Sequence, residues 1–364
     1  MKPLTDIRHH IIYSRPQDVM GYFGWPSIAR LDDGTLIVGA SGFRHRHVCP
    51  WGVTTLFVSH DDGETWSDPF IIHDSPLDDR DVGIIHLKNQ IVMATWFTLD
   101  PRQFRDSFEK WPDGEMKDRM RARLSALTDA SVQEHAGSWT RVSFDGGKTW
   151  SVPHRAPVST PHGPILMKNG TLLYFGKQFP TEMNRPWGEV AAAVSLDYGL
   201  TWKEIGTVPL PEGMTVENFH EPHVYEAEDG RLVGMIRHQE LHGFADLKIY
   251  QTESLDGGKT WSVPVLTEAL GAPPHLLMHS DGPLIMTYGC RREPFGQRVM
   301  LSRDEGRTWY ADLPIRDDAP NTDLGYPATV ELGDKSLLTV YYQAINEGEN
   351  TSLLCSRWRL PEED

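Results

Sequence analysis

The chain has 364 residues, with 35 Lys and Arg against 51 Asp and Glu, so its formal net charge at pH 7 is -16. Such a surface repels nucleic acid and anionic membranes, so neither is expected as a partner, and an anionic ligand would need locally clustered arginines. The 12 Trp, 32 Gly and 26 Pro, with few long helical patterns, predict an all-β protein rich in turns.

The first residues and the cysteines bear on compartment and metal chemistry. The N-terminal segment lacks the apolar core of a signal peptide, and no apolar run is long enough to span a bilayer. We therefore expect a cytoplasmic protein, or a secreted one if a signal peptide has been removed. Cys49, Cys290 and Cys355 form neither a disulfide framework nor a zinc spacing, and no metal or cofactor is expected.

One short motif, Ser-x-Asp-x-Gly-x-Thr-Trp, occurs five times. The copies run from Ser59 to Trp66, Ser143 to Trp150, Ser195 to Trp202, Ser254 to Trp261 and Ser302 to Trp309. The Asp carboxylate can accept backbone N–H bonds across a turn, Gly supports a left-handed backbone, and Trp packs on a sheet. The motif predicts a repeated structural turn rather than a reactive site.

A second repeat is a hairpin, found six times. Each copy begins with an opening residue and reaches a tight turn eight residues later. The opening residues are Trp25, Asp81, Pro161, Glu221, Pro273 and Tyr326, and the turns begin at Asp33, Asn89, Asn169, Asp229, Asp281 and Asp334. Six such units predict a six-bladed β-propeller of four-stranded antiparallel blades, forming a single domain over residues 1–364. The hairpins would supply the inner strands.

Two places depart from the repeat. The sixth blade has no Trp-containing turn of its own, so we expect an N-terminal strand around residues 11–14 to complete it. A long interval holds an insertion, residues 100–130, in which Met116, Met120, Leu124 and Leu127 recur at helical spacing. This pattern predicts a helix over the ring, with an apolar stripe that packs rather than binds ligand.

The fourth hairpin places two charges at one end of a sheet. Glu221 enters its first strand, Asp229-Gly230 forms the turn, and Arg237 leaves the second strand. Opening residues converge on the axis of a propeller, so Asp81, Glu221 and Tyr326 should face a common pocket. Taken alone, the Glu221–Arg237 pair is also compatible with a surface ion pair on a sheet edge.

These motifs, over essentially the whole chain, resemble those of the sialidase (neuraminidase) superfamily. Glu221 and Arg237 match a Glu that opens one inner strand and an Arg that ends its partner strand. Arg298 resembles a further Arg of the family, and Tyr326 matches the Tyr that opens the last inner strand. The resemblance implies a glycosidase in which Tyr326 is the nucleophile or cation stabiliser, Glu221 its base, and Arg237 and Arg298 a carboxylate clamp.

Two positions differ from the family pattern. The first Arg of the family falls on Gly24, and the acid/base Asp falls at about Cys49, although Arg44 fits the Arg that accompanies it. Asp81 is the preferred substitute for the acid because it can titrate.

The second choice for the acid is His45 or His47, since imidazole titrates near neutral pH. Other candidate substrate contacts near the same level are Arg44, Trp25, His162, His223 and His275.

A Tyr beside a Glu suits an anionic sugar, because a neutral phenol is not repelled by the substrate's charge as a carboxylate nucleophile would be. We therefore expect an exo-glycoside hydrolase of sialidase type that releases a terminal carboxylated sugar. Two alternatives stay open. One is a different exo-glycosidase, or a polysaccharide lyase, acting at a uronate. The other is a carbohydrate-binding propeller without catalysis. Oligomeric state is not indicated by the sequence.

Overall fold

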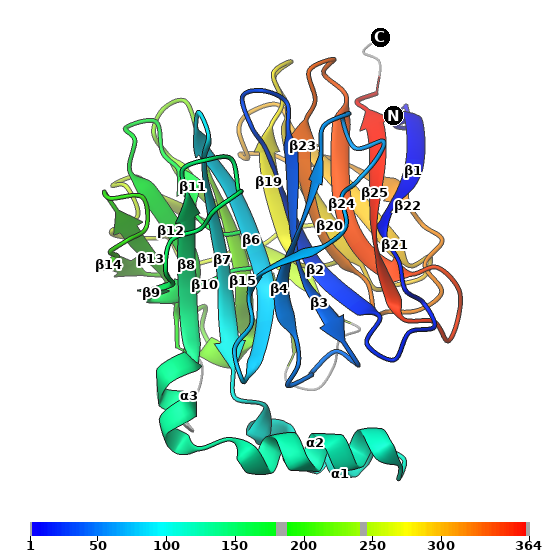
Figure 1. The fold of residues 1–364 in the computed structure, drawn as a ribbon. Coiled ribbons are helices and arrows are strands. Elements are labelled where there is room, and N and C mark those ends of the chain that lie inside the picture. The colour runs from blue at the N-terminus through cyan, green and yellow to red at the C-terminus, as the bar shows by residue number, and fades with distance from the viewer. Residues whose placement is uncertain (1, 180–187, 241–245, 362–364) are drawn as a thin grey trace.

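The computed structural model describes residues 2–179, 188–240 and 246–361, in which six antiparallel sheets follow one another around a ring (Figure 1). The first strands of neighbouring sheets contact each other and therefore surround the axis. This arrangement is the six-bladed β-propeller that the repeats predict. Within the described residues, no helix is both long enough and apolar enough to cross a membrane.

The blades take their strands in chain order. The first blade comprises β2 (Tyr22–Arg30), β3 (Leu36–Arg44), β4 (Val53–Ser59) and β5 (Phe70–His73). The second comprises β6 (Asp78–Lys88), β7 (Ile91–Leu99), β8 (Gly137–Ser143) and β9 (His154–Ala156). The third comprises β10 (Val158–Ser159), β11 (Ile165–Leu166), β12 (Leu172–Gln178), β13 (Val190–Ser195) and β14 (Lys203–Thr207). The fourth blade comprises β15 (Phe219–Glu226), β16 (Leu232–His238), β17 (Lys248–Ser254) and β18 (Val265–Leu266). The fifth comprises β19 (Pro274–Met278), β20 (Leu284–Cys290), β21 (Gly296–Ser302) and β22 (Tyr310–Arg316). The sixth comprises β23 (Gly325–Glu331), β24 (Leu337–Ala344), β25 (Thr351–Arg359) and β1 (Thr5–Tyr13).

The third blade departs from four strands. Its inner strand is divided into two short pieces, β10 and β11, which both pair with β12. Between them lie Pro161 and Pro164, which have no backbone N–H to donate, and Gly163, whose φ is +77°. The break follows from these residues.

The N-terminal strand completes the sixth blade, as expected. Strand β1 pairs antiparallel with β25, with His10 opposite Cys355 and Ile11 opposite Leu354. The two ends of the chain therefore lie in one sheet, side by side in Figure 1.

The five repeated turns share the hydrogen bonds of their Ser, Asp, Gly and Thr residues, whereas the Trp indole donates to the Gly carbonyl oxygen in four of them and to Gln251 Oε1 in the turn of Trp309. In the turn that begins at Ser143, the Ser hydroxyl donates to Asp145 Oδ1 (2.8 Å) and accepts from Gly147 N (2.8 Å). Thr149 donates both its backbone N–H and its hydroxyl to the same Asp145 carboxylate. The Trp150 indole donates to the Gly147 carbonyl oxygen. The structural role predicted for the motif is confirmed.

Four inner strands carry the same backbone irregularity at the opening residue. Trp25, Asp81, Glu221 and Tyr326 have φ values of 54°, 53°, 44° and 55°, and each lies at a break in the pairing register of its strand. Left-handed backbone is unfavourable for residues with a Cβ, by roughly 1–2 kcal/mol each. Strain of this kind, repeated at one level of a ring, marks that level as a candidate site.

The insertion forms three helices, α1 (Arg105–Glu109), α2 (Glu115–Ala126) and α3 (Asp129–His135), preceded by a 3-10 turn at Pro101–Phe104. Helical structure thus runs five residues beyond the predicted limit of 130, because Thr128 caps α3 by accepting a hydrogen bond from Ser131 N. A second 3-10 turn, Val216–Asn218, precedes β15.

The predicted apolar stripe of the insertion is a packing surface. Met120, Leu124 and Leu127 are buried in a cluster with Leu77 and the partly buried Trp51. The helices lie at one end of the ring, below β7 and β8 in Figure 1. They are joined to β7 and β8, and the loop that follows β3, which carries His47, packs against them through Val48 and Trp51.

Candidate functional site

A cavity of about 160 Å³ lies where the inner strands open. It is lined by His47, Arg80, Asp81, Phe97, Ser159, Thr160, Pro161, Lys177, His220, Glu221, Arg237, Arg291 and Tyr326. These residues come from the opening ends of the first strands and from the ends, or just beyond the ends, of the second strands. Residues from all parts of the sequence therefore meet around one axial space.

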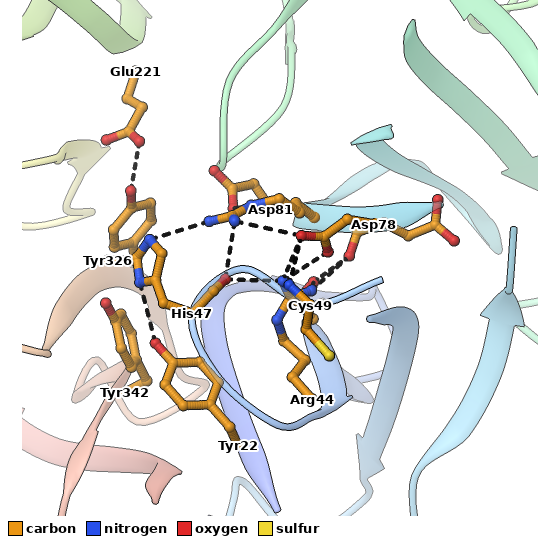
Figure 2. Close-up of polar contacts among 12 residues, drawn as sticks. Tyr22, Arg44, His47, Cys49, Asp78, Asp81, Glu221, Tyr326 and Tyr342 are labelled. Atoms are coloured by element: carbon orange, nitrogen blue, oxygen red, sulfur yellow. Dashed lines mark hydrogen bonds and ion pairs between the residues drawn. The ribbon is translucent and has the colours of Figure 1, made fainter. Parts of the chain in front are cut away.

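Glu221, Tyr326 and Arg237 form one hydrogen-bonded group on the wall of this cavity. The Tyr326 hydroxyl donates to Glu221 Oε1 (2.5 Å), as Figure 2 shows. Arg237 Nη1 donates to Glu221 Oε2 (2.5 Å) and to the Tyr326 oxygen (3.2 Å). Gln239 holds the other guanidinium nitrogen through its Oε1 (2.7 Å).

The charges in this group are set by the neighbours. Burial raises the pKa of Glu221, but Arg237 and the hydrogen bond from Tyr326 outweigh it, so the pKa lies below its ordinary value. Burial and the Glu221 charge raise the pKa of Tyr326 well above its ordinary value. The resting group is therefore a neutral phenol hydrogen-bonded to an ionised carboxylate.

Asp81 is a second carboxyl group at the same level. Burial, together with the Glu221 charge, raises its pKa to about 7 against the opposing effect of Arg80. Its Oδ1 finds no hydrogen-bond partner among the described residues and lies 4.0 Å from Arg80 Nε. Asp81 and Glu221 thus have pKa values pushed in opposite directions, the pattern that separates an acid from a base in one site.

The cavity also gathers cations. Arg80 donates to the His47 carbonyl oxygen (2.9 Å) and lies over the Trp25 ring, 4.3 Å from its centroid. Arg291 donates to the Leu324 carbonyl oxygen (3.0 Å). Burial lowers the pKa of Lys177 to about 8, and its ammonium donates to the Phe219 carbonyl oxygen (2.5 Å). With Arg237, these residues give an anionic ligand several charged donors despite the acidic surface of the protein.

The predicted clamp residue Arg298 lies outside the axial cavity. Its Nε donates to Asp312 Oδ1 (2.5 Å) and its Nη2 to the Asp312 carbonyl oxygen (2.8 Å), and it does not line the cavity. The reason is its place on β21, the third strand of its blade, which lies farther from the axis than the first two. Arg291, at the end of the second strand of that blade, lines the cavity instead.

Arg44 and Trp25 support the site from behind. Arg44 is fully buried, pairs with Asp78 (2.7 Å) and lies over the Trp25 ring at 4.9 Å. Trp25 is also fully buried and lines no part of the cavity, with its ring 6.5 Å from that of Tyr326. Both were predicted to contact substrate, and the structure instead places them in the packing beneath it.

Of the two histidines considered as alternative acids, only His47 lines the axial cavity. His47 reaches the cavity, and its Nε2 lies 3.3 Å from Arg80 Nη2. His45 points away, its Nδ1 being 3.0 Å from the Val19 carbonyl oxygen. Cys49, at the position of the missing carboxylate, is buried, and its backbone N–H donates to Asp78 Oδ2 (3.0 Å), which fixes the loop.

His162, His223 and His275 form a cluster of their own. The rings of His223 and His275 are stacked at 4.6 Å, with His162 5.0 Å from His275. Burial lowers the pKa of all three, to about 3 for His223. None lines the axial cavity. They were predicted as substrate contacts, whereas the structure buries them as uncharged packing groups.

Lys177 and Arg291 line the cavity but were not identified from the sequence. Lys177 is the sixth residue of β12, as Arg237 is the sixth residue of β16, so the equivalent position of the neighbouring blade was a usable signal. Within the described ranges, no three His, Cys, Asp or Glu side chains are grouped so as to hold a metal ion.

The sequence model of the BNR repeat-like domain matches residues 117–340. The chain belongs to this family. No curated protein gives a significant sequence match.

Solved structures share the fold over nearly the whole chain. A protein of unknown function from Dyadobacter fermentans is 23% identical, with 98% of this chain and 100% of that chain covered and a TM-score of 0.76. The NanB sialidase from Streptococcus pneumoniae is 14% identical (98% and 70% covered, TM-score 0.65). The intramolecular trans-sialidase from Ruminococcus gnavus is 15% identical (97% and 97% covered, TM-score 0.63). At these identities the likeness establishes the sialidase-type fold, in agreement with the predicted superfamily, and not a substrate.

Proposed function

We propose that the protein is an exo-glycoside hydrolase that releases a terminal carboxylated sugar, sialic acid or a related one, by way of Tyr326. The hydrogen bond from the Tyr326 hydroxyl to Glu221 is the observation that carries the proposal. A phenol is a weak nucleophile unless a base takes its proton, and Glu221 is ionised and positioned to do so. The sialidases among the structural neighbours support the same class.

The proposed reaction has two displacements. In the first, Tyr326 Oη bonds to the anomeric carbon, its proton passes to Glu221, and the bond to the leaving oxygen breaks as Asp81 donates a proton to that oxygen. In the second, water gives a proton to Asp81 and its oxygen bonds to the anomeric carbon, the bond from that carbon to Tyr326 Oη breaks, and Tyr326 Oη recovers its proton from Glu221. Arg237 stabilises Glu221 and the phenolate character that develops on Tyr326.

Charge and size support a small anionic substrate. Arg80, Lys177, Arg237 and Arg291 provide the donors for a carboxylate, and the cavity is at the small end of ligand sites, which favours a single terminal sugar. The uronate lyase is less supported, because the Tyr326 hydroxyl is bonded to a carboxylate rather than to a histidine.

The test is a panel of 4-methylumbelliferyl glycosides of sialic acid, a 3-deoxy-2-keto sugar and uronic acids. We expect turnover of at least one, and a loss of about 10²-fold or more in kcat for Tyr326→Phe, because the nucleophilic oxygen is removed. Arg237→Lys should raise KM and lower kcat, whereas the matched change Arg298→Lys, outside the cavity, should leave both within about twofold. Unchanged turnover by Tyr326→Phe would refute the proposal. Binding of these sugars without turnover would instead identify a carbohydrate-binding propeller.

A further inference from the structure

The axial cavity carries more positive charge than one carboxylate can balance. Its lining residues include four cationic side chains, those of Arg80, Lys177, Arg237 and Arg291. The wall has two carboxyl groups, Asp81 and Glu221, and its histidines, His47 and His220, add no charge near pH 7 because burial lowers their pKa values. Two positive charges therefore remain in excess when Asp81 is ionised, and three when it is protonated. A sugar with one carboxylate would compensate only one of them.

Two of the cations have carboxylates of the protein beside them. Arg237 Nη1 donates to Glu221 Oε2 (2.5 Å), and Arg80 Nη1 lies 3.7 Å from Asp78 Oδ2. Lys177 differs, because within the part of the chain that the structure describes it forms no ion pair with a carboxylate. Since a buried charge is unfavourable without a counter-charge, an anionic group of a ligand has most to contribute at Lys177.

The Lys177 ammonium is oriented by the main chain. Its Nζ donates to the carbonyl oxygens of Val216 and Phe219 (2.5 Å to Phe219), which use two of its three N–H donors. Ser159 lies opposite Lys177 in the register of β10 and β12, and both residues line the cavity. Because residues paired across two strands present their side chains on the same face, an ammonium and a hydroxyl lie side by side on this wall. The two groups suit a charged oxygen.

Lys177 and the nucleophile lie on opposite sides of the ring. The six blades follow one another around the axis, Lys177 belongs to the third and Tyr326 to the sixth. Arg237 and Arg291 belong to the fourth and fifth blades, between them, and Arg237 contacts the Tyr326 oxygen (3.2 Å). A carboxylate beside the anomeric carbon would therefore bind at the two arginines. A group that reaches Lys177 must lie at the end of the sugar that points away from Tyr326.

We propose that the terminal sugar is a dianion, with one carboxylate beside the anomeric carbon and a second acidic group at the far end of the ring, which Lys177 and Ser159 bind. The proposal rests on the hydrolase function and narrows its substrate class. A carboxylate and a phosphate share the charged oxygens that this wall would bind. The small volume of the cavity, about 160 Å³, favours a carboxylate attached directly to the ring.

The experiment compares free sugars in pairs that differ only at the far end. A 3-deoxy-2-heptulosonic acid is paired with the corresponding heptulosaric diacid, 3-deoxy-octulosonic acid with its 8-phosphate, and N-acetylneuraminic acid with its 9-phosphate. Binding to the unmodified full chain is measured by calorimetry at pH 7.5. In at least one pair, we expect the dianionic member to bind about tenfold more tightly. The pair that shows this preference identifies the second group as carboxylate or phosphate.

Two lysines of the third blade provide matched variants. Lys177→Met keeps the length of the side chain and removes its charge, so it should reduce the preference for the dianion to about twofold or less and leave binding of the monoanion within about threefold. Lys168 is exposed in the turn of the same blade, outside the cavity, and also donates to a main-chain oxygen, that of Ala227 (3.1 Å). Lys168→Met should leave the preference unchanged. Equal losses of both members in Lys177→Met would show a structural role and refute the proposal.

The pH dependence distinguishes a charge on Lys177 from its packing. Burial lowers the pKa of Lys177 to about 8, so its charge and the preference for the dianion should decline as the pH rises from 7.5 to 9.5. The charged and titratable neighbours are Glu217 and His220, and neither a carboxylate nor a histidine of lowered pKa titrates in this range. Lys177→Arg should retain the preference up to pH 9.5, because a guanidinium stays charged. The same decline in Lys177→Arg would refute the assignment to Lys177.

The outcomes separate this inference from the hydrolase function. If the two members of every pair bind alike, or if no sugar binds, the second anionic group is refuted, even when aryl glycosides are hydrolysed. A preference for the dianion that depends on Lys177, in a protein that hydrolyses no aryl glycoside of the preferred sugar, would support the dianion site and refute the hydrolase.

Discussion

The repeated turns and the strand openings show two uses of one sixfold pattern. The five turns have the same Ser, Asp, Gly and Thr hydrogen bonds, and their Trp residues are all retained. The strand openings occur at matching places in the blades, yet they carry Trp25, Asp81, Pro161, Glu221, Pro273 and Tyr326. Residues that repeat therefore maintain the fold, whereas among the residues that differ at equivalent places Asp81, Glu221 and Tyr326 line the axial cavity.

Among the strand openings and the repeated turns, we expect a change at Asp81 to have the largest effect on activity. As a general acid, Asp81 must be protonated, and with a pKa of about 7 it loses that proton as the pH rises through neutrality, so kcat/KM should fall above about pH 7. Asp81→Asn should lower kcat by about 10²–10⁴-fold for a sugar leaving group and abolish this alkaline decline. The loss should be smaller for 4-methylumbelliferone, which leaves more easily.

A control for Asp81 lies two residues earlier. Burial also raises the pKa of Asp79 to about 7, but Asp79 lies outside the cavity, bonded to Ser75 and Thr98. If the alkaline decline survives Asp81→Asn and disappears in Asp79→Asn, Asp81 is not the acid.

A change in a repeated turn should affect stability and leave activity intact. The Ser302 hydroxyl is buried, accepts from Gly306 N (2.8 Å) and donates to Asp304 (2.8 Å). Ser302→Ala leaves the Gly306 N–H without this acceptor, so the free energy of unfolding should fall by about 1–3 kcal/mol. Denaturant unfolding measures the loss, and kcat at a temperature where the variant is folded should equal that of the unchanged protein. A large fall in kcat would contradict the view that the repeated turns maintain the fold without taking part in the site.

The histidine cluster should affect stability only at acid pH and should have no effect at pH 7 and above. The pKa values of His162, His223 and His275 are lowered in the folded state, so below about pH 6.5 the unfolded chain binds protons that the folded chain does not. The free energy of unfolding is then highest above pH 6.5 and falls as the pH decreases, by up to about 1.4 kcal/mol per pH unit for each histidine.

Unfolding at pH 7, 6 and 5 tests this linkage. The slope of stability against pH should decrease in His162→Gln and should not change in His60→Gln, since His60 is exposed. Equal slopes in all three proteins would show that the cluster does not control acid stability.

The fold could be predicted from the sequence because its signals are local. Each turn motif and each Asp-Gly or Asn-Gly hairpin is specified within about ten residues. The closing strand β1 followed from counting blades. The break in the third blade was harder to predict, because Pro161 matches the opening position of the repeat while Pro164 interrupts the strand.

The site was predicted only where residues open a first strand. Glu221, Tyr326 and Asp81 share that position, and Arg237 ends the partner strand. Arg298 was misplaced because a strand's distance from the axis depends on its rank in the blade, which the spacing of one arginine does not reveal. Whether His47 or His45 faces the cavity is decided by an irregular loop and its contact with Trp111, which no periodic pattern encodes.

Closure of the ring by β1 and β25 has a consequence for biosynthesis. Tyr326 belongs to the blade that is finished only when the last strand pairs with the first, whereas Asp81 and Glu221 belong to sheets already complete by then. The nascent chain must therefore leave the edge of β1 unpaired until β25 has been made, and the blade that carries Tyr326 is completed after the blades that carry Asp81 and Glu221.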